Sequence, residues 1–177
     1  MDLTKQPRPN TEIEKVACDL AVIYEGVDPT IITTIAVCIL YWYQNTSNMS
    51  DIITYPSDKD MLVIYGVCVI LCMTLILIFF VMSTKNMFKT SRPCQTIGIQ
   101  TTHCCPDNYD IPSGHTALGI FHGLVLYSAG YDYLSILFFI QPILRYVGKQ
   151  HSLTAITVGG IYGIIFYLIF AFFFNRH

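Results

Sequence analysis

Charged side chains are scarce in this chain: lysine, arginine, aspartate and glutamate together make up 12% of its 177 residues. A soluble domain carries roughly 25%, so a chain with half that share suits an apolar solvent, and the lipid bilayer is the simplest one. Hydrophobic residues account for 53%. So apolar a chain is a poor fit for nucleic acid, and the net charge of −2 indicates no particular partner.

A second absence concerns the N-terminus, where no basic segment leads directly into an apolar core, so no secretory signal peptide is predicted. Residues 11–25 repeat apolar residues at helical spacing, and Thr11 with Glu14 fits a capping box. Two interpretations stay open: an amphipathic helix lying on the membrane surface, or a soluble helix packed on the body. We expect residues 1–28 to form this tail and helix, and residues 29–177 to form a transmembrane domain.

Two long uncharged stretches, Met61–Met82 and Leu153–Phe174, are each 22 residues long. At 1.5 Å per residue, each crosses the roughly 30 Å hydrocarbon core unaided. Three shorter apolar stretches are Thr30–Tyr43, His115–Ala129 and Tyr131–Val147. We expect flanking polar residues to lengthen them, which gives an all-α membrane bundle of about five transmembrane helices.

Small residues at intervals of four mark two of these stretches. Gly119 and Gly123, like Gly159 and Gly163, are placed to let neighbouring helices approach closely. His122 lies inside the first pair, and we expect it to be packed or hydrogen-bonded within the bundle.

Two polar loops carry the chemistry, Ser83–Ser113 and the basic turn Arg145–His151. If the third and fourth spans form a hairpin, both loops emerge on the same face and build one site. That site would contain three cations and two imidazoles: Lys85, Arg92, Arg145, His115 and His151.

This set suits a phosphate ester. Arginine forms bidentate hydrogen bonds to phosphate oxygens, and lysine adds a point charge. Ser113 and Gly114 open the third span, so backbone N–H groups at a helix N-terminus face the same anion. One imidazole can attack phosphorus, while the other protonates the departing oxygen.

The segments Lys85-x6-Arg92-Pro93, Pro112-Ser113-Gly114-His115 and Arg145-x5-His151 together resemble the three-part signature of the type 2 phosphatidic acid phosphatase (PAP2) superfamily. This membrane family includes lipid phosphate phosphatases, undecaprenyl and dolichyl diphosphate phosphatases and, more distantly, vanadium haloperoxidases. The resemblance covers residues 85–163. It implies a PAP2-like bundle that needs no cofactor and no metal, with the following roles: His151 is the nucleophile, His115 is the general acid, and Lys85, Arg92, Ser113, Gly114 and Arg145 hold the phosphate.

One departure from the family pattern bears on catalysis. The third motif usually continues His-x3-Asp, in which the carboxylate orients the nucleophilic imidazole, but Ala155 stands at that place. Thr154, Ser152 or a carboxylate from another loop, such as Asp110, are candidates to stand in. The dolichyl diphosphate phosphatases also lack this Asp, so its loss is compatible with activity.

A second departure is topology, because the family usually has six spans and a site facing the lumen or the exterior. With a cytoplasmic N-terminus, the site face carries eight basic residues and the opposite face carries two, which favours a cytoplasmic site. The sequons at Asn45 and Asn48 would then be lumenal. We expect a multi-pass protein of the endoplasmic reticulum or another endomembrane.

The cysteines leave another alternative open. Three of the seven gather with a histidine in the first loop: Cys94, His103, Cys104 and Cys105. Their arrangement matches no strong zinc spacing, and a disulfide becomes plausible if the loop is lumenal.

The predicted function is metal-independent hydrolysis of a lipid phosphate or isoprenoid diphosphate through a phosphohistidine intermediate. Both substrate classes stay open, and the missing Asp favours the second by resemblance. The main alternative is a PAP2-like protein that binds lipid phosphates or partners without turnover, for which Ala155 is the best evidence. A transferase related to the sphingomyelin synthases and a channel are further alternatives; the oligomeric state is open.

Overall fold

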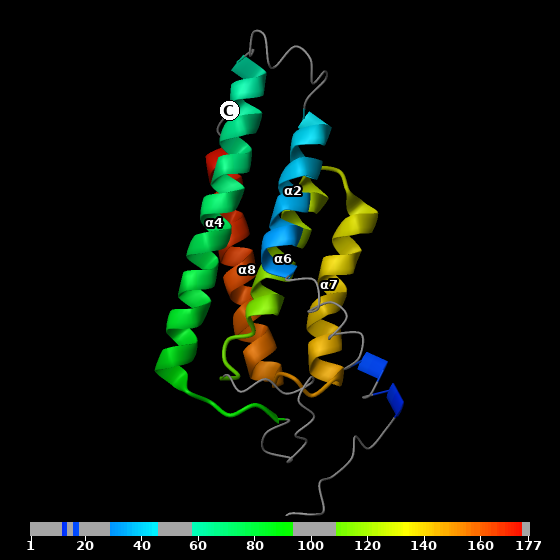
Figure 1. Ribbon diagram of the computed structural model, residues 1–177, viewed down its shortest axis with the longest axis vertical. Helices are drawn as coiled ribbons and strands as arrows, with labels where there is room; N and C mark the ends of the chain where they lie inside the picture. Colours follow the sequence, from blue (N-terminus) through cyan, green and yellow to red (C-terminus); the bar gives the residue numbers. More distant parts are fainter. Residues whose placement is uncertain (1–11, 14–15, 18–28, 46–57, 94–108, 175–177) are drawn as a thin grey trace, which may run out of the picture.

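The computed structural model describes residues 12–13, 16–17, 29–45, 58–93 and 109–174. Within these residues the regular structure is helical throughout, as the apolar stretches predict. The five helices are α2 (Pro29–Asn45), α4 (Asp58–Phe88), α6 (Gly114–Ser128), α7 (Asp132–Val147) and α8 (Leu153–Phe174). They form a bundle in which α6 packs most extensively against α8 and α7 (Figure 1).

Helices α6 and α7 form the predicted hairpin. They are joined at Gly130, whose φ of 85° favours glycine, and the turn is closed by a hydrogen bond from Tyr131 N to Leu126 O of 2.9 Å. As a result, the N-terminus of α6 and the C-terminus of α7 lie at the same end of the bundle. The C-terminus of α4 and the N-terminus of α8 lie at that end as well (Figure 1).

The predicted close approach at the paired glycines is confirmed. A Cβ added at Gly163 would lie 2.5 Å from the carbonyl oxygen of Ala117, and one at Gly159 would lie 2.4 Å from that of Ser113. On the other side of α6, a Cβ at Gly119 would lie 3.0 Å from the carbonyl oxygen of Phe138. Real Cβ atoms do not tolerate the shortest of these distances, so the glycines bring α8 and α7 against the backbone of α6.

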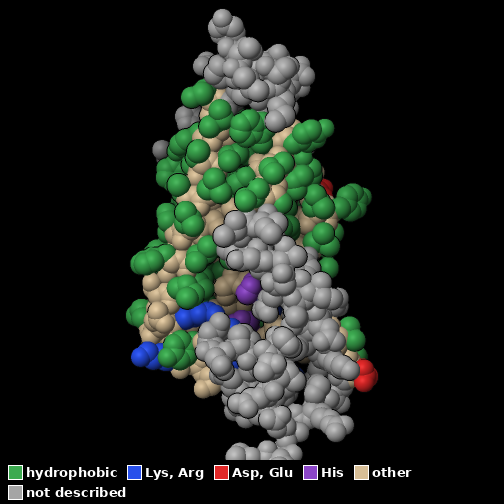
Figure 2. Space-filling view, viewed as in Figure 1, with side chains coloured by type: hydrophobic (Ala, Val, Ile, Leu, Met, Phe, Trp, Pro, Cys, Tyr) green, Lys and Arg blue, Asp and Glu red, His purple; other side chains and the backbone are tan. Residues whose placement is uncertain are grey.

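On the face of the bundle that Figure 2 shows, hydrophobic side chains cover most of the described helical surface. Among the described residues, two segments are long and apolar enough to cross a membrane, one in α4 and one in α8, and only 28% and 22% of these windows is buried. Large side chains such as Leu75, Phe79 and Leu168 are 67%, 70% and 59% exposed. A core helix of a soluble protein would be mostly buried, so this surface is suited to lipid.

Two predicted boundaries were wrong. Helix α4 continues past Met82 to Phe88, so the first loop begins later than expected and Lys85 belongs to the last turn of a helix. Helices α6 and α7 are not lengthened by flanking residues; at 15 and 16 residues they are about 22–24 Å long, which is shorter than the hydrocarbon core.

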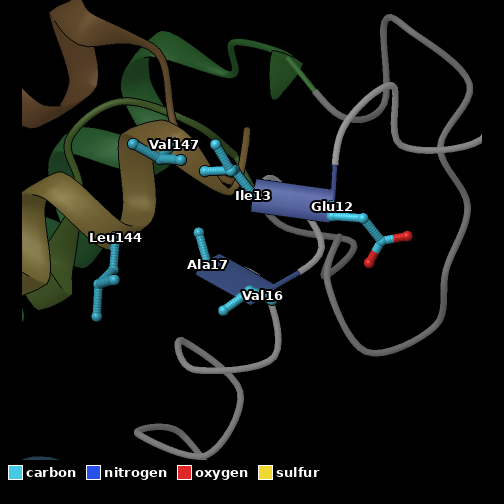
Figure 3. A pocket seen from close by; sticks show the side chains of 6 residues that line it. All are labelled: Glu12, Ile13, Val16, Ala17, Leu144 and Val147. Atoms are coloured by element: carbon cyan, nitrogen blue, oxygen red, sulfur yellow. The ribbon is translucent and has the colours of Figure 1, made fainter.

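The predicted amphipathic segment lies largely outside the described residues. Its described parts, residues 12–13 and 16–17, are helical. Together with Leu144 and Val147 of α7 they line an apolar cavity of about 370 Å³ (Figure 3). The segment therefore lies beside the end of α7 that carries Arg145.

His122 is 1% exposed in the middle of the bundle, as predicted. Its Nε2 atom lies 3.1 Å from Thr74 Oγ1 of α4 and 3.5 Å from Thr34 Oγ1 of α2. Three helices thus share one polar contact.

Candidate active site

The two predicted polar loops meet at one end of the bundle. His151 Nδ1 lies 2.8 Å from Asp110 Oδ1, and Arg92 Nη1 donates a hydrogen bond of 3.1 Å to the carbonyl oxygen of Gln150. These contacts join residues 41 and 58 positions apart in sequence. Figure 2 shows Lys, Arg and His side chains gathered towards this end, below the apolar surface.

The segment that follows α4 is held against the segment that precedes α6. Asp110 N donates to the carbonyl oxygen of Thr90 at 2.8 Å, and Ile111 N donates to Thr90 Oγ1 at 3.2 Å. This pairing brings Arg92 and Asp110 from opposite ends of the first loop to the same place.

The N-terminus of α6 is fixed to α8 in turn. Ser113 N donates to the carbonyl oxygen of Ala155 at 3.0 Å, and Thr116 Oγ1 donates to Ser113 Oγ at 2.9 Å. Because Ser113 Oγ accepts that bond, the Ser113 hydroxyl group can donate its own proton to another acceptor. The N–H groups of Gly114 and His115 belong to the first turn of α6 and have no acceptor within the helix, so they suit an anion.

The turn between α7 and α8 places the nucleophile candidate. Gln150 N and His151 N both donate to the carbonyl oxygen of Arg145, at 3.1 and 3.3 Å. Lys149 adopts a φ of 56°, the left-handed region that non-glycine residues seldom occupy. The result is a tight turn in which Arg145, Gln150 and His151 are all buried.

The contact between Asp110 and His151 sets the tautomer of the imidazole. The carboxylate accepts a hydrogen bond from Nδ1–H, so the lone pair is on Nε2. Ser152 N donates to both oxygens of Asp110, at 3.2 and 3.3 Å. Although burial acts to raise it, the pKa of Asp110 lies below its ordinary value because His151 and Ser152 hydrogen-bond to the carboxylate. Asp110 is therefore ionised.

Burial lowers the pKa of His151 to about 4, and the nearby charges of Arg92 and Lys85 act in the same direction, against the opposing hydrogen bond to Asp110. At neutral pH the imidazole is therefore neutral, with an unprotonated Nε2. A neutral imidazole next to an ionised carboxylate is the form a nucleophile requires.

The predicted cations converge around this pair. Lys85, Arg92 and Arg145 are 8%, 3% and 2% exposed, and Lys85 lies within electrostatic range of both arginines and Asp110. His115 is within electrostatic range of Arg145, His151, Lys85 and Arg92. The structure thus brings all seven predicted site residues together, in a cluster with three cations and one carboxylate.

The contacts of Thr154, Ser152 and Asp110 distinguish between these three candidates to replace the missing motif carboxylate. Thr154 is exposed, and Ser152 Oγ accepts a hydrogen bond from Ala155 N at 3.1 Å, which caps the start of α8. Of the three, Asp110 is the one whose side chain contacts the imidazole of His151.

Sequence reasoning missed Gln150. Its side chain is fully buried, and Oε1 accepts a hydrogen bond from Arg145 Nη1 at 2.5 Å. The signal that could have pointed to it is its position directly before His151, within the third motif. An uncharged residue in a basic turn nevertheless gave no reason to single it out.

Several predicted features lie outside the described residues. These are the cysteine–histidine cluster of the first loop and the sequon at Asn48: Cys94, His103, Cys104, Cys105 and Asn48. Of the described cysteines, Cys38 is buried, whereas Cys68 and Cys72 are exposed on α4.

Comparison with known proteins adds no relative: no protein-family model matches the chain, and neither do any of the curated proteins or solved structures.

Proposed function

We propose that this protein is a membrane lipid phosphatase of the PAP2 type, which hydrolyses a lipid phosphate or isoprenoid diphosphate through a phosphohistidine on His151. The observation that carries the proposal is the 2.8 Å contact between His151 Nδ1 and Asp110 Oδ1. It supplies the orienting carboxylate whose absence at Ala155 was the best argument for a protein without turnover.

In the first step, His151 Nε2 attacks phosphorus. The N–P bond forms while the bond from phosphorus to the lipid oxygen breaks, and His115 gives its proton to that oxygen. Asp110 stabilises the positive charge that develops on the imidazole, as the carboxylate does in other nucleophile–histidine–acid arrangements. The leaving group is a lipid alcohol from a monoester, or a lipid monophosphate from a diphosphate.

In the second step, water attacks the phosphohistidine. His115 accepts a proton from this water, the new P–O bond forms, and the N–P bond breaks to regenerate neutral His151. Inorganic phosphate leaves the site. Because the charge in both steps is spread over the equatorial oxygens, Lys85, Arg92 and Arg145 provide the compensating positive charge, and the proposed reaction needs no metal ion.

The position of the site supports a lipid substrate. It lies at one end of a bundle whose sides are apolar, where a headgroup can reach the cations while its tail stays in the bilayer. We propose that all five helices cross the membrane, with the short α6 and α7 packed among longer neighbours. In agreement with the distribution of basic residues, the proposed site faces the cytoplasm.

The test is phosphate release from phosphatidate and from farnesyl diphosphate by the full-length, detergent-purified protein in EDTA. We expect release by the parent and its loss in His151→Ala. The matched control is His122→Asn, which changes another buried histidine outside the site and should retain release. The faster substrate assigns the lipid class.

Absence of release by a folded parent that still binds inorganic phosphate would favour the alternative, a lipid-phosphate-binding protein without turnover. Loss of activity in EDTA that returns with a divalent cation would contradict the metal-independent mechanism.

A further inference from the structure

The side chain of Gln150 is a polar group that the proposed mechanism does not use. It lies between the two arginines of the site: Oε1 accepts from Arg145 Nη1 at 2.5 Å, and the backbone carbonyl oxygen accepts from Arg92 Nη1 at 3.1 Å. The residue is 0% exposed and directly precedes His151 in the chain. It is therefore enclosed within the phosphate-binding cluster.

The hydrogen bond to Arg145 fixes which way the amide group is turned. A guanidinium group has only donors, so the oxygen of the amide must face Arg145 and the NH2 group must face away from it. Among the described residues, Gln150 Nε2 has no hydrogen-bond partner. A buried donor without an acceptor is costly, so this position calls for an acceptor that arrives with the ligand.

The surroundings define that acceptor. Two guanidinium groups, the Lys85 ammonium and the imidazole of His151 share the cluster with Gln150, and this positive field favours an anionic oxygen. From this geometry we propose that Gln150 Nε2–H donates a hydrogen bond to a non-bridging oxygen of the bound phosphate, beside the arginines. The inference deepens the proposed function and rests on it for the identity of the ligand.

Two roles for Gln150 must be separated, support of Arg145 through Oε1 and donation to phosphate through Nε2. The substitution Gln150→Met separates them when it is made in an Arg145→Ala background, because no guanidinium group remains at position 145 to be supported and the substitution removes the donor without adding charge. If Gln150 only supports Arg145, Gln150→Met costs no further phosphate affinity in that background. If Gln150 donates to phosphate, the substitution costs affinity there as well.

The experiment measures the affinity of the full-length protein in detergent for inorganic phosphate and for orthovanadate by calorimetry, without turnover. We expect Gln150→Met to lose on the order of tenfold in affinity for both anions in the Arg145→Ala background, while the melting temperature without ligand stays near that of Arg145→Ala. Affinity equal to that of Arg145→Ala alone would overturn the inference.

A second measurement covers the case in which the double variant does not fold. Gln150→Met in the otherwise unchanged protein is neutral and similar in length but has no donor, and it should also lose anion affinity; parent-like affinity would again overturn the inference. Failure of the parent itself to bind either anion has a different meaning, since it would overturn the proposed phosphate site and this inference with it. The two failures are thus distinguishable.

Discussion

Two buried histidines occupy contrasting regions of this molecule. His151 and His122 are 2% and 1% exposed, yet His151 contacts the carboxylate of Asp110, whereas His122 contacts the hydroxyl groups of Thr34 and Thr74. A hydroxyl group donates or accepts as required, so it satisfies either tautomer of His122. A carboxylate only accepts, so it fixes the tautomer of His151.

The charges around the two residues differ in the same way. His151 feels Arg92 and Lys85, whereas His122 packs against the rings of Phe121 and Phe138, whose centroids lie 5.4 and 6.2 Å from its own. Burial of a histidine therefore does not by itself make a site. What distinguishes His151 from His122 is a fixed tautomer combined with a positive field.

Removing the carboxylate of Asp110 should have the largest effect on phosphate release. Asp110→Ala leaves the tautomer of His151 unfixed and its developing charge uncompensated, so we expect phosphate release to fall by about 10²–10⁴-fold, by analogy with the serine-protease triad. Substitution by Asn would preserve the size of the side chain but favour the wrong tautomer, and it should be similarly impaired.

The double variant Asp110→Ala with Ala155→Asp sharpens this prediction. It restores a carboxylate four residues after His151, the place where the PAP2 signature has it, and release should recover by at least about tenfold over Asp110→Ala. If Asp110→Ala alone retained parental release, Asp110 would not be the orienting group.

The second-largest effect should come from removing one of the positive charges near His151. Lys85 and Lys89 lie one turn apart at the end of α4, but Lys85 is buried in the cluster whereas Lys89 is exposed. Lys85→Ala should raise KM or weaken inorganic phosphate binding by on the order of tenfold or more. Lys89→Asn, in which asparagine tolerates the φ of 47° at this position, serves as the matched control and should bind phosphate normally. Equal losses in both variants would mean that the effect is one of general surface charge.

The lowered pKa of His151 gives a third, smaller effect, on stability. The unfolded chain protonates this histidine near pH 6.5, while the folded protein does so only near pH 4. Between these values the unfolded state binds more protons, so stability is fully present above pH 6.5 and decreases as the pH falls towards 4, by at most about 1.4 kcal/mol per pH unit.

Melting temperatures of the parent and of His151→Asn in detergent, measured at a fixed scan rate between pH 7 and pH 4, check this prediction. The variant lacks the titrating group and should show a shallower decrease. Parallel curves for the two proteins would contradict it.

What the sequence could predict here depends on the range over which each interaction acts. The glycine pairs and the presence of five helices are encoded in patterns that repeat every one or two turns, and the structure agrees with these predictions. The end of α4 was misplaced because its last turns are polar, and a polar helix carries little of the apolar pattern from which helix ends are read.

The partner of His151 lay beyond such reasoning. Asp110 reaches it only because the backbone of Thr90 holds the residues before α6 and because Ser152 N donates to the carboxylate. Sequence alone named three candidates for this position, and their tertiary contacts decide between them. Gln150 was missed for a related reason, since its importance lies in what its amide contacts rather than in its residue type.

The smallest effect should come from changing the surroundings of His122. Thr74→Val preserves the shape of the side chain but removes the hydroxyl group that lies 3.1 Å from His122 Nε2. Hydrogen bonds between membrane helices contribute about 0.6 kcal/mol on average, so we expect a slightly lower melting temperature and unchanged phosphate release. The hydroxyl of Thr34, at 3.5 Å, remains as a second partner for His122. A large loss of release in a folded Thr74→Val protein would contradict the distinction between the two histidines, because it would make the polar contact inside the bundle part of the catalytic machinery.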